Sequence, residues 1–146
     1  MPNPKQDDLK NIAREYFKRL DAGRPDLLEL FTDDVQIYFP KFGLGVGRAA
    51  FLEIAQGLGQ RQIAIEHNTA DYLFIQSGNH LAVEGTTKGR FKNGEHWAAG
   101  ETPNGRFCNV FEFRDGLISR LHVYLDPDGA GNHTEGFLWG REGRKW

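Results

Sequence analysis

The spacing of apolar residues changes once along this chain, near residue 60. Before that point apolar side chains recur every three to four positions, which is typical of amphipathic helices. After it they alternate with polar residues, in runs separated by turn sequences such as Asn93-Gly94 and Asn104-Gly105. Helices followed by successive hairpins predict an α+β fold, in which three N-terminal helices pack on one face of a strongly bent, mainly antiparallel sheet.

Three helices are predicted in the first sixty residues. The first begins near Asp7, ends near Gly23 and buries one apolar stripe, made of Leu9, Ile12, Ala13, Tyr16, Phe17 and Leu20. A second, short helix starts at Pro25 and carries Leu27, Leu28 and Phe31. The third spans residues 49–58. Strands are expected at 35–39, 63–76, 81–91, 95–101, 106–113 and 117–125.

The segment 41–47 contains the spacing Gly43-x-Gly45-x-Gly47 ahead of the third helix. Glycines before a helix can bind a phosphate, but the dinucleotide-binding motif also requires a parallel βαβ unit. The strands that follow this helix have the pattern of hairpins instead. We therefore interpret 41–47 as a flexible loop.

Length and charge narrow the class of protein. The 146 residues suffice for one domain with its own core, expected at 1–128 and followed by a glycine-rich tail at 129–146. The net charge is −2 and the basic residues are scattered, which argues against a nucleic-acid partner. No apolar run approaches the roughly 20 residues of a membrane span. The N-terminus lacks the apolar core of a signal peptide, so we expect a cytoplasmic protein without a membrane partner.

The histidines and the single cysteine give little support for a metal site. None of the five histidines forms a His-x-His or His-x-x-x-His pair. Cys108 is the only cysteine, so no disulfide can form within the chain. It lies in an aromatic strand, where a small buried residue is a better interpretation than a nucleophile. No metal or cofactor is expected.

Two polar residues lie on predicted apolar strand faces. His67 shares a face with Ile63 and Ile65, so it is either a hydrogen-bonded core residue or an inward-pointing acid–base group. Asn109 alternates with Phe107 and Phe111. A buried amide requires partners, which could be a ligand oxygen or a neighbouring strand.

The last strand has one polar and one apolar face. His122, Tyr124 and Asp126 alternate with Leu121, Val123 and Leu125. The polar set could be a site, but the outer face of an edge or interface strand is the better interpretation. The apolar set is then the core or pocket face.

Two stretches of sequence resemble a known family. They are REYFKRLDAGRPDLLELFTDDVQIYFP at 14–40 and FEFRDGLISRLHVYLD at 111–126. Together with the third helix they resemble the nuclear-transport-factor-2-like superfamily, and within it the SnoaL-like polyketide cyclase and ketosteroid isomerase group. The resemblance implies a cone of helices and bent sheet whose open end is a hydrophobic pocket. It also implies a homodimer that forms through the outer face of the sheet.

The same resemblance places functional positions residue by residue. Tyr16 falls on or beside the oxyanion tyrosine of the ketosteroid isomerases, and Asn109 falls on their protonated acid. Their catalytic base would fall at Phe39, which cannot accept a proton, so their mechanism is excluded in its usual form. The carboxylate of limonene epoxide hydrolases would fall near Val123, also apolar. Asp126 is the only carboxylate near the end of the last strand.

The expected pocket is apolar with a few convergent polar groups, the usual pattern of a ligand site. Its predicted lining is Tyr16, Phe39, Phe51, Ile65, Phe107, Phe111, Leu121 and Val123, with Tyr38 at the rim. The first hypothesis is a cofactor-independent isomerase, cyclase or dehydratase acting on a small hydrophobic or polycyclic molecule. In it His67 is the acid–base group, while Tyr16 and Asn109 polarise an oxygen. The alternatives are a non-catalytic binder of hydrophobic ligands and a dimeric interaction protein with a filled core.

Overall fold

A computed structural model describes residues 4–128 and residue 146. Its eight strands form one sheet in the order β2-β1-β8-β7-β5-β3, and β4 and β6 also pair with β5. The strands are Phe31–Phe39 (β1), Gly43–Val46 (β2), Gln62–His67 (β3), Leu73–Ser77 (β4), His80–Phe91 (β5), His96–Ala98 (β6), Arg106–Arg114 (β7) and Leu117–Leu125 (β8). The helices are Pro4–Asp21 (α1) and Arg48–Gly59 (α2), and Pro25–Leu30 (η1) and Thr69–Asp71 (η2) are 3-10 turns.

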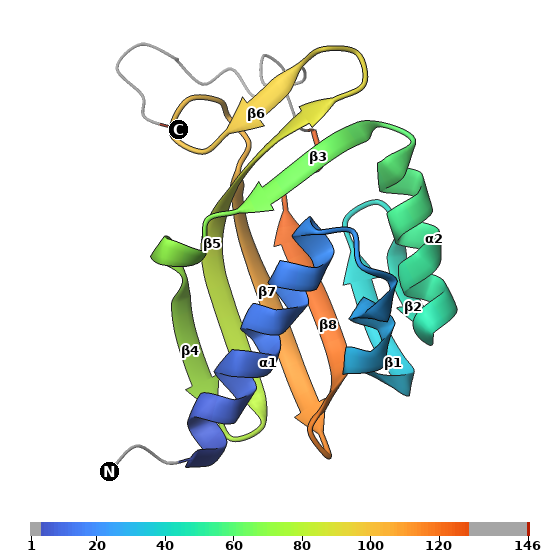
Figure 1. The fold of residues 1–146 in the computed structure, drawn as a ribbon, viewed down its shortest axis with the longest axis vertical. Coiled ribbons are helices and arrows are strands. Elements are labelled where there is room, and N and C mark those ends of the chain that lie inside the picture. The colour runs from blue at the N-terminus through green and yellow to red at the C-terminus, as the bar shows by residue number, and fades with distance from the viewer. Residues whose placement is uncertain (1–3, 129–145) are drawn as a thin grey trace.

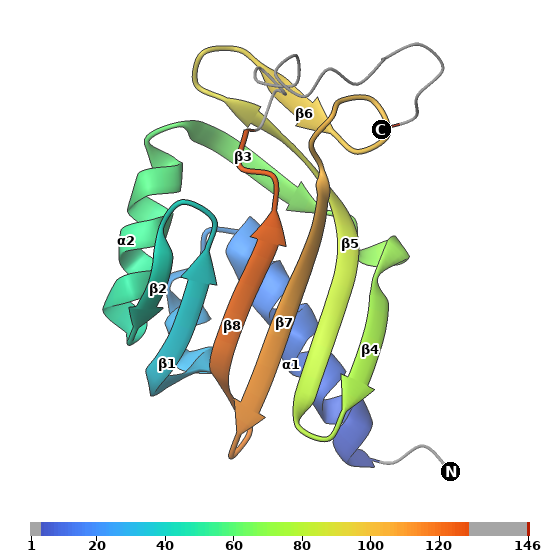
Figure 2. The same ribbon diagram turned by 180° about the vertical axis from the view of Figure 1, so that it is seen from behind.

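The bend in the sheet lies within β5, which has 12 residues. Residues 80–86 of β5 pair with β7, and residues 87–91 pair with β3. Because the partner changes near Thr86, the β3–β5–β6 part folds over the end of the sheet, as Figure 1 shows. The helices lie on one side of the sheet, and Figure 2 shows the other side without a helix in front of it. The predicted α+β fold, with three N-terminal helices on a bent, mainly antiparallel sheet, is confirmed.

Helix α1 forms where the sequence predicts it and packs its apolar stripe on the inner face of the sheet. Ala13, Tyr16 and Phe17 are buried in the core. The helix has Lys18 and Arg19 in its last turn, where cations interact favourably with the helix dipole. The core continues through Phe31, Phe111, Phe113, Ile118 and Leu121, all buried.

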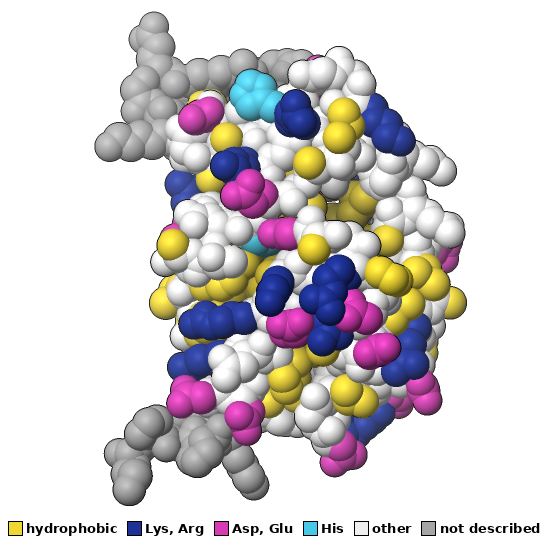
Figure 3. Space-filling model, viewed as in Figure 1, with side chains coloured by type: hydrophobic (Ala, Val, Ile, Leu, Met, Phe, Trp, Pro, Cys, Tyr) yellow, Lys and Arg dark blue, Asp and Glu magenta, His cyan; other side chains and the backbone are white. Residues whose placement is uncertain are grey.

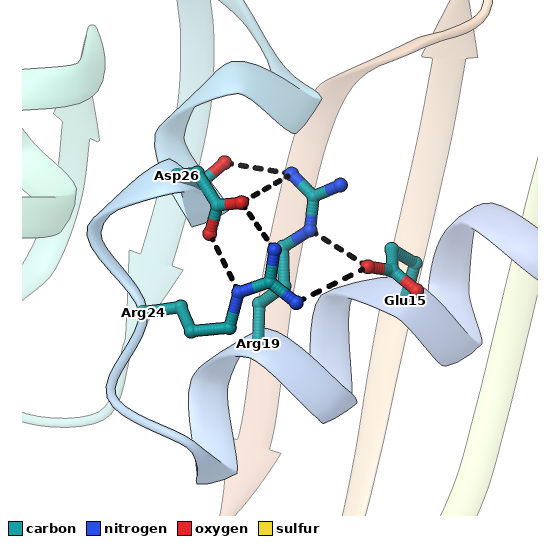
Figure 4. A network of polar contacts seen from close by, with 4 residues as sticks. All are labelled: Glu15, Arg19, Arg24 and Asp26. Carbon is teal, nitrogen blue, oxygen red and sulfur yellow. Dashed lines mark hydrogen bonds and ion pairs between the residues drawn. The ribbon is translucent and has the colours of Figure 1, made fainter.

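A cluster of charged side chains joins the end of α1 to η1. Figure 4 shows Arg19 and Arg24 between the carboxylates of Glu15 and Asp26. Arg19 Nε donates to Glu15 Oε1 at 2.8 Å, and Arg19 NH1 donates to the main-chain oxygen of Asp26 at 2.8 Å. The hydrogen bond from Arg19 lowers the pKa of Glu15, and the one from Arg24 lowers the pKa of Asp26. This cluster anchors the last turn of α1, the turn that carries Asp21.

Three local predictions are wrong. Residues 43–46 of the expected loop form strand β2, antiparallel to β1. A built Cβ on Gly45 would lie 2.6 Å from the Cβ of Ala50, so this strand needs a glycine to let α2 approach, and a glycine hides the strand pattern. Phe31 begins β1 instead of lying in the second helix. The run 63–76 is two strands, separated by a 3-10 turn that Asn68 caps.

The sheet is also less regular than a simple meander. Strand β1 pairs in parallel with β8, while the remaining pairs are antiparallel. Cys108 is half-buried on the outer face, so the expectation of a buried residue is wrong. Burial and the nearby Glu84 carboxylate raise the pKa of its thiol. The expected glycine-rich tail lies outside the described residues apart from Trp146. No helix in the described part of the chain could cross a membrane.

Candidate functional site

A cavity of about 140 Å³ lies between the inner face of the sheet and helices α1 and α2. Figure 3 shows a hollow floored by hydrophobic side chains, below β3 and beside α2. The lining is mostly aliphatic and aromatic, and its polar groups come from Tyr16, Gln62, His67, Thr87, Asn104, Arg106, Asn109 and Asp126.

Most of the predicted site residues line this one cavity. They are Tyr16, Phe39, Phe51, Ile65, His67, Phe107, Asn109, Leu121, Val123 and Asp126. Sequence reasoning missed the wall formed by the hairpin of β5 and β6, namely Thr87, Phe91 and Trp97. The alternation of Thr87, Gly89 and Phe91 along β5 was a signal that could have identified this wall.

Two predicted lining residues do not reach the cavity. Tyr38 faces the opposite side of the sheet, because its neighbours Ile37 and Phe39 face inward along β1. Its ring lies 5.7 Å from that of His122 and 5.5 Å from that of Tyr124. Phe111 points inward but is fully buried in the packed part of the core, with its ring 5.5 Å from that of Tyr16. Both predictions are corrected.

His67 is paired with a carboxylate that the sequence analysis did not name. Its Nδ1 lies 2.6 Å from Asp21 Oδ1, and its backbone N–H donates to Asp21 Oδ2 at 2.7 Å. His67 is 8% exposed, and its ring contacts those of Phe17 at 4.8 Å and Phe107 at 5.0 Å. The imidazole therefore has one orientation, fixed by two hydrogen bonds and two aromatic rings.

The position of Asp21 gives only a weak signal in the sequence. Asp21 is the last residue of α1, where a negative charge interacts unfavourably with the helix dipole. The hydrogen bonds with His67 offset that unfavourable interaction. The two residues are 46 positions apart, so no local pattern links them.

The pairing decides which nitrogen of His67 can act as a base. An ionised carboxylate only accepts hydrogen bonds, so the Nδ1–H of the neutral imidazole donates to Asp21. Nε2 is then the nitrogen with a free lone pair. Nε2 can therefore accept a proton from a ligand while Nδ1 keeps its hydrogen bond to Asp21. The arrangement is that of an oriented general base.

Tyr16 and Asn109 supply hydrogen-bonding groups in the same cavity. Burial, followed by the charge of Asp21, raises the pKa of Tyr16, so its hydroxyl stays protonated and can donate. Asn109 is 3% exposed, and its Oδ1 is buried without a hydrogen-bond partner among the described residues. An orphaned buried amide oxygen is costly, which is typical of a ligand-binding position.

The end of β8 brings a carboxylate to the cavity. The strand ends at Leu125, so Asp126 leaves the alternation that keeps His122 and Tyr124 on the outer face, and it lines the cavity beside Pro127. Arg106 also lines this region, and its guanidinium donates to the main-chain oxygen of Trp146 at 2.9 Å. These two residues place one charge of each sign in the cavity wall.

His122 belongs to a different cluster, on the outer face. Its Nε2 lies 3.0 Å from Gln36 Oε1, and its Nδ1 lies 3.0 Å from Arg120 NH2. Burial, followed by the charge of Arg120, lowers the pKa of His122. The interpretation of His122 and Tyr124 as outer-face residues therefore agrees with the structure.

Solved structures with this fold are numerous and distant in sequence. An NTF2-like protein from Anabaena variabilis is 21% identical with a TM-score of 0.71, covering 89% of this chain and 98% of its own. A candidate polyketide cyclase from Pseudomonas putida is 20% identical with a TM-score of 0.67, covering 83% and 93%. TerC, co-crystallised with polyporic acid, is 16% identical with a TM-score of 0.68, covering 90% and 95%.

These structural likenesses show the fold alone. No curated protein matches the sequence. The family model of the SnoaL-like domain matches residues 13–121, which is well over half of the chain and includes the second half of α1, all of α2 and most of the sheet. This chain therefore belongs to the SnoaL-like family, within the NTF2-like superfamily.

Proposed function

We propose that this protein is a cofactor-independent enzyme of the isomerase, cyclase or dehydratase kind, which moves a proton at the carbon next to a carbonyl group. The observation that carries the proposal is the His67–Asp21 pair in the wall of an apolar cavity. An imidazole that a carboxylate holds in one orientation can act as a general base, and general acid–base catalysis of this kind contributes about 10²–10⁴ in rate.

The proposed step uses groups that line one cavity. His67 Nε2 removes the proton, and the Asp21 carboxylate stabilises the imidazolium that forms. The Tyr16 hydroxyl and the Asn109 amide donate hydrogen bonds to the oxygen on which negative charge develops. The same imidazolium then returns the proton to another carbon in an isomerisation, or to a departing hydroxyl group in a dehydration. Asp126 is a second candidate acid–base group, at the end of β8.

The apolar lining supports a small hydrophobic substrate. A water-poor cavity strengthens the hydrogen bonds on which this chemistry depends. A neighbour of this fold, TerC, was co-crystallised with polyporic acid, which supports the use of such a cavity for ligands. The presence of the cavity argues against a protein whose cone is filled core.

An assay that does not require the natural substrate to be known tests the proposal. The protein is incubated in D₂O with a panel of small aryl and alkyl ketones, and exchange of the α-protons is followed by proton NMR. We expect exchange above the buffer rate with the unaltered protein, and roughly a 10²-fold or larger loss with His67→Asn. His80→Gln, at an exposed position, is the matched control and keeps the full rate. Equal rates for buffer, unaltered protein and His67→Asn contradict the proposal.

A binding protein without turnover is the second candidate. It is favoured by Phe39 and Val123, apolar residues at the positions where related enzymes carry carboxylates, both in the cavity wall. This candidate predicts saturable ketone binding with no exchange above background in any variant. Asp126→Asn tests whether that carboxylate takes part in proton transfer, because the exchange rate falls only if it does.

We also propose a homodimer through the outer face of the sheet. That face carries exposed hydrophobic side chains on β2, β4 and β8, namely Leu44, Val46, Leu73, Ile75 and Tyr124. Exposed apolar residues gathered on one face often mark an interface. Sedimentation velocity of the unaltered protein should give a dimer and Val46→Glu a monomer. A monomer at all concentrations contradicts this proposal.

A further inference from the structure

The hairpin of β5 and β6 forms one wall of the cavity, beside His67. In the strand register His67 lies opposite Thr87, and the next inward row places Ile65 opposite Gly89 and Gly89 opposite Trp97. Residues two positions apart along a strand are separated by about 6.6 Å. Trp97 therefore belongs to the row directly beyond the dyad of His67 and Asp21.

Trp97 is held in one position. Its indole Nε1 donates to Thr87 Oγ1 at 3.0 Å, and its ring lies 4.9 Å from that of Phe91. The residue is 3% exposed while still lining the cavity. A side chain that is this well packed, and whose one polar atom is already bonded, acts as a fixed apolar wall.

Gly89 shows that the chain makes room for this indole. A Cβ built on Gly89 would lie 2.1 Å from the Trp97 ring and 2.5 Å from the main-chain oxygen of Ala64. Gly89 is not among the residues with positive φ, so its backbone conformation does not require glycine. The role of this glycine is to let the indole lie across β5, in the space where an inward side chain would otherwise stand.

We propose that Trp97 is the specificity-determining residue of the cavity and limits the substrate to one ring beside the reacting carbonyl. The cavity volume of about 140 Å³ is close to that of the apolar cavities that hold a single benzene-sized molecule. The indole fills the row beyond His67, so a second fused ring has no place there. The substrate class is thus a single-ring aryl or cycloalkenyl ketone, narrower than the polycyclic molecules that the family resemblance allows.

The assumption that the reacting carbon lies beside His67 rests on the proposed function. The limit that Trp97 sets on the size of the ligand does not. The two are tested separately by measuring binding and exchange in the same variants. Acetophenone and 2-acetonaphthone serve as the probes, because they share the acetyl group and differ by one fused ring.

Isothermal titration calorimetry of both ketones tests the size limit. We expect the unaltered protein to bind acetophenone at least tenfold more tightly than 2-acetonaphthone, against the trend of hydrophobicity. Trp97→Leu should reverse that order, because it opens the row beyond His67. His67→Asn should keep the order of the unaltered protein while losing α-proton exchange, which separates failure of the size limit from failure of the proposed chemistry.

A second variant covers the case in which Trp97→Leu does not fold, as judged by far-UV circular dichroism and thermal melting. Gly89→Ala places a Cβ 2.1 Å from the indole and 2.5 Å from the main-chain oxygen of Ala64, so the indole must move into the cavity and β3 must shift; acetophenone binding should weaken at least tenfold in the folded protein. The matched control is Gly57→Ala, since a Cβ at Gly57 meets no atom within 4 Å. Tighter binding of the naphthyl ketone by the unaltered protein, or an unchanged order in folded Trp97→Leu, overturns the proposal. So does unchanged acetophenone affinity in Gly89→Ala.

Discussion

The two faces of the sheet each carry one buried histidine, and the two differ in their partners. His67 on the inner face and His122 on the outer face are both 8% exposed. His67 is paired with the Asp21 carboxylate and faces an apolar cavity. His122 is hydrogen-bonded to the Gln36 amide and lies beside the Arg120 guanidinium.

The comparison shows that burial alone does not make a histidine a base. A neighbouring carboxylate stabilises the protonated imidazole, whereas a neighbouring guanidinium destabilises it. The carboxylate orients the His67 imidazole as a general base, whereas burial and Arg120 lower the pKa of His122, which suits a structural network. Sequence patterns predict the face on which each histidine lies but not the charge of its partner.

The largest expected effect tests the inner face as the core of the fold. Phe111→Ala removes a fully buried ring that packs against Tyr16, Phe17 and Phe113, and should lower the free energy of unfolding by about 3–5 kcal/mol. Val110 precedes Phe111 in β7, and its side chain lies on the outer face. Val110→Ala is the matched control and should lower the free energy of unfolding by less than about 1 kcal/mol. Urea denaturation measures both. Equal losses would contradict the assignment of Phe111 to the packed core of the fold.

Asp21→Asn tests the inner histidine through its partner. The amide keeps the shape of the side chain but cannot stabilise an imidazolium, so α-proton exchange should fall roughly 10²-fold, about 2.7 kcal/mol. The double variant with His67→Asn should be no slower than either single variant, because the two residues act as one unit. Gln36→Ala removes the corresponding partner of His122 and should leave the rate unchanged. A loss of exchange rate in Gln36→Ala would show that the outer-face histidine also contributes to the reaction.

Asn109→Leu contrasts an unpaired inner polar group with the hydrogen-bonded His122. The orphaned Oδ1 costs stability, so an apolar side chain of similar size should raise the free energy of unfolding by about 1 kcal/mol. The same variant should weaken acetophenone binding, because an amide that could bond to the ligand is lost. Thermal melting and calorimetry measure the two effects. A loss of stability would show that Asn109 is bonded within the fold.

The smallest expected effect concerns His122 and pH. Its pKa in the folded protein lies below the ordinary value of 6.5, because of burial and then Arg120. The unfolded chain therefore binds more protons in this range, so the free energy of unfolding should fall as the pH drops below about 6.5. His122→Gln should flatten that dependence between pH 7.5 and 5.5. If the free energy of unfolding of His122→Gln depended on pH as steeply as that of the unaltered protein, the lowered pKa of His122 would be contradicted.

The dyad is the part of the site that the sequence could not predict. His67, Tyr16 and Asn109 each followed from strand or helix periodicity, because a buried face imposes a repeat of 2 or 3.6 residues. The predicted face of His67 was wrong at Ile63, which is exposed because the register of β3 shifts between Gln62 and Ala64. Asp21 lies at the end of a helix, 46 residues before His67, and no repeat connects them. Strand β2 was missed for a related reason, since Gly45 has no side chain to show an alternating pattern.

The sequence by itself determined that helices precede a mainly antiparallel sheet, the family, and the inward direction of most cavity residues, because these depend on local spacing. Only the tertiary structure decided that β1 lies parallel to β8, that β5 bends near Thr86, and that Asp21 meets His67. It also decided that Trp97 lies across Gly89. The physical reason is that local spacing records which side of an element is buried, whereas the partner that buries it is chosen by packing between segments distant in the chain.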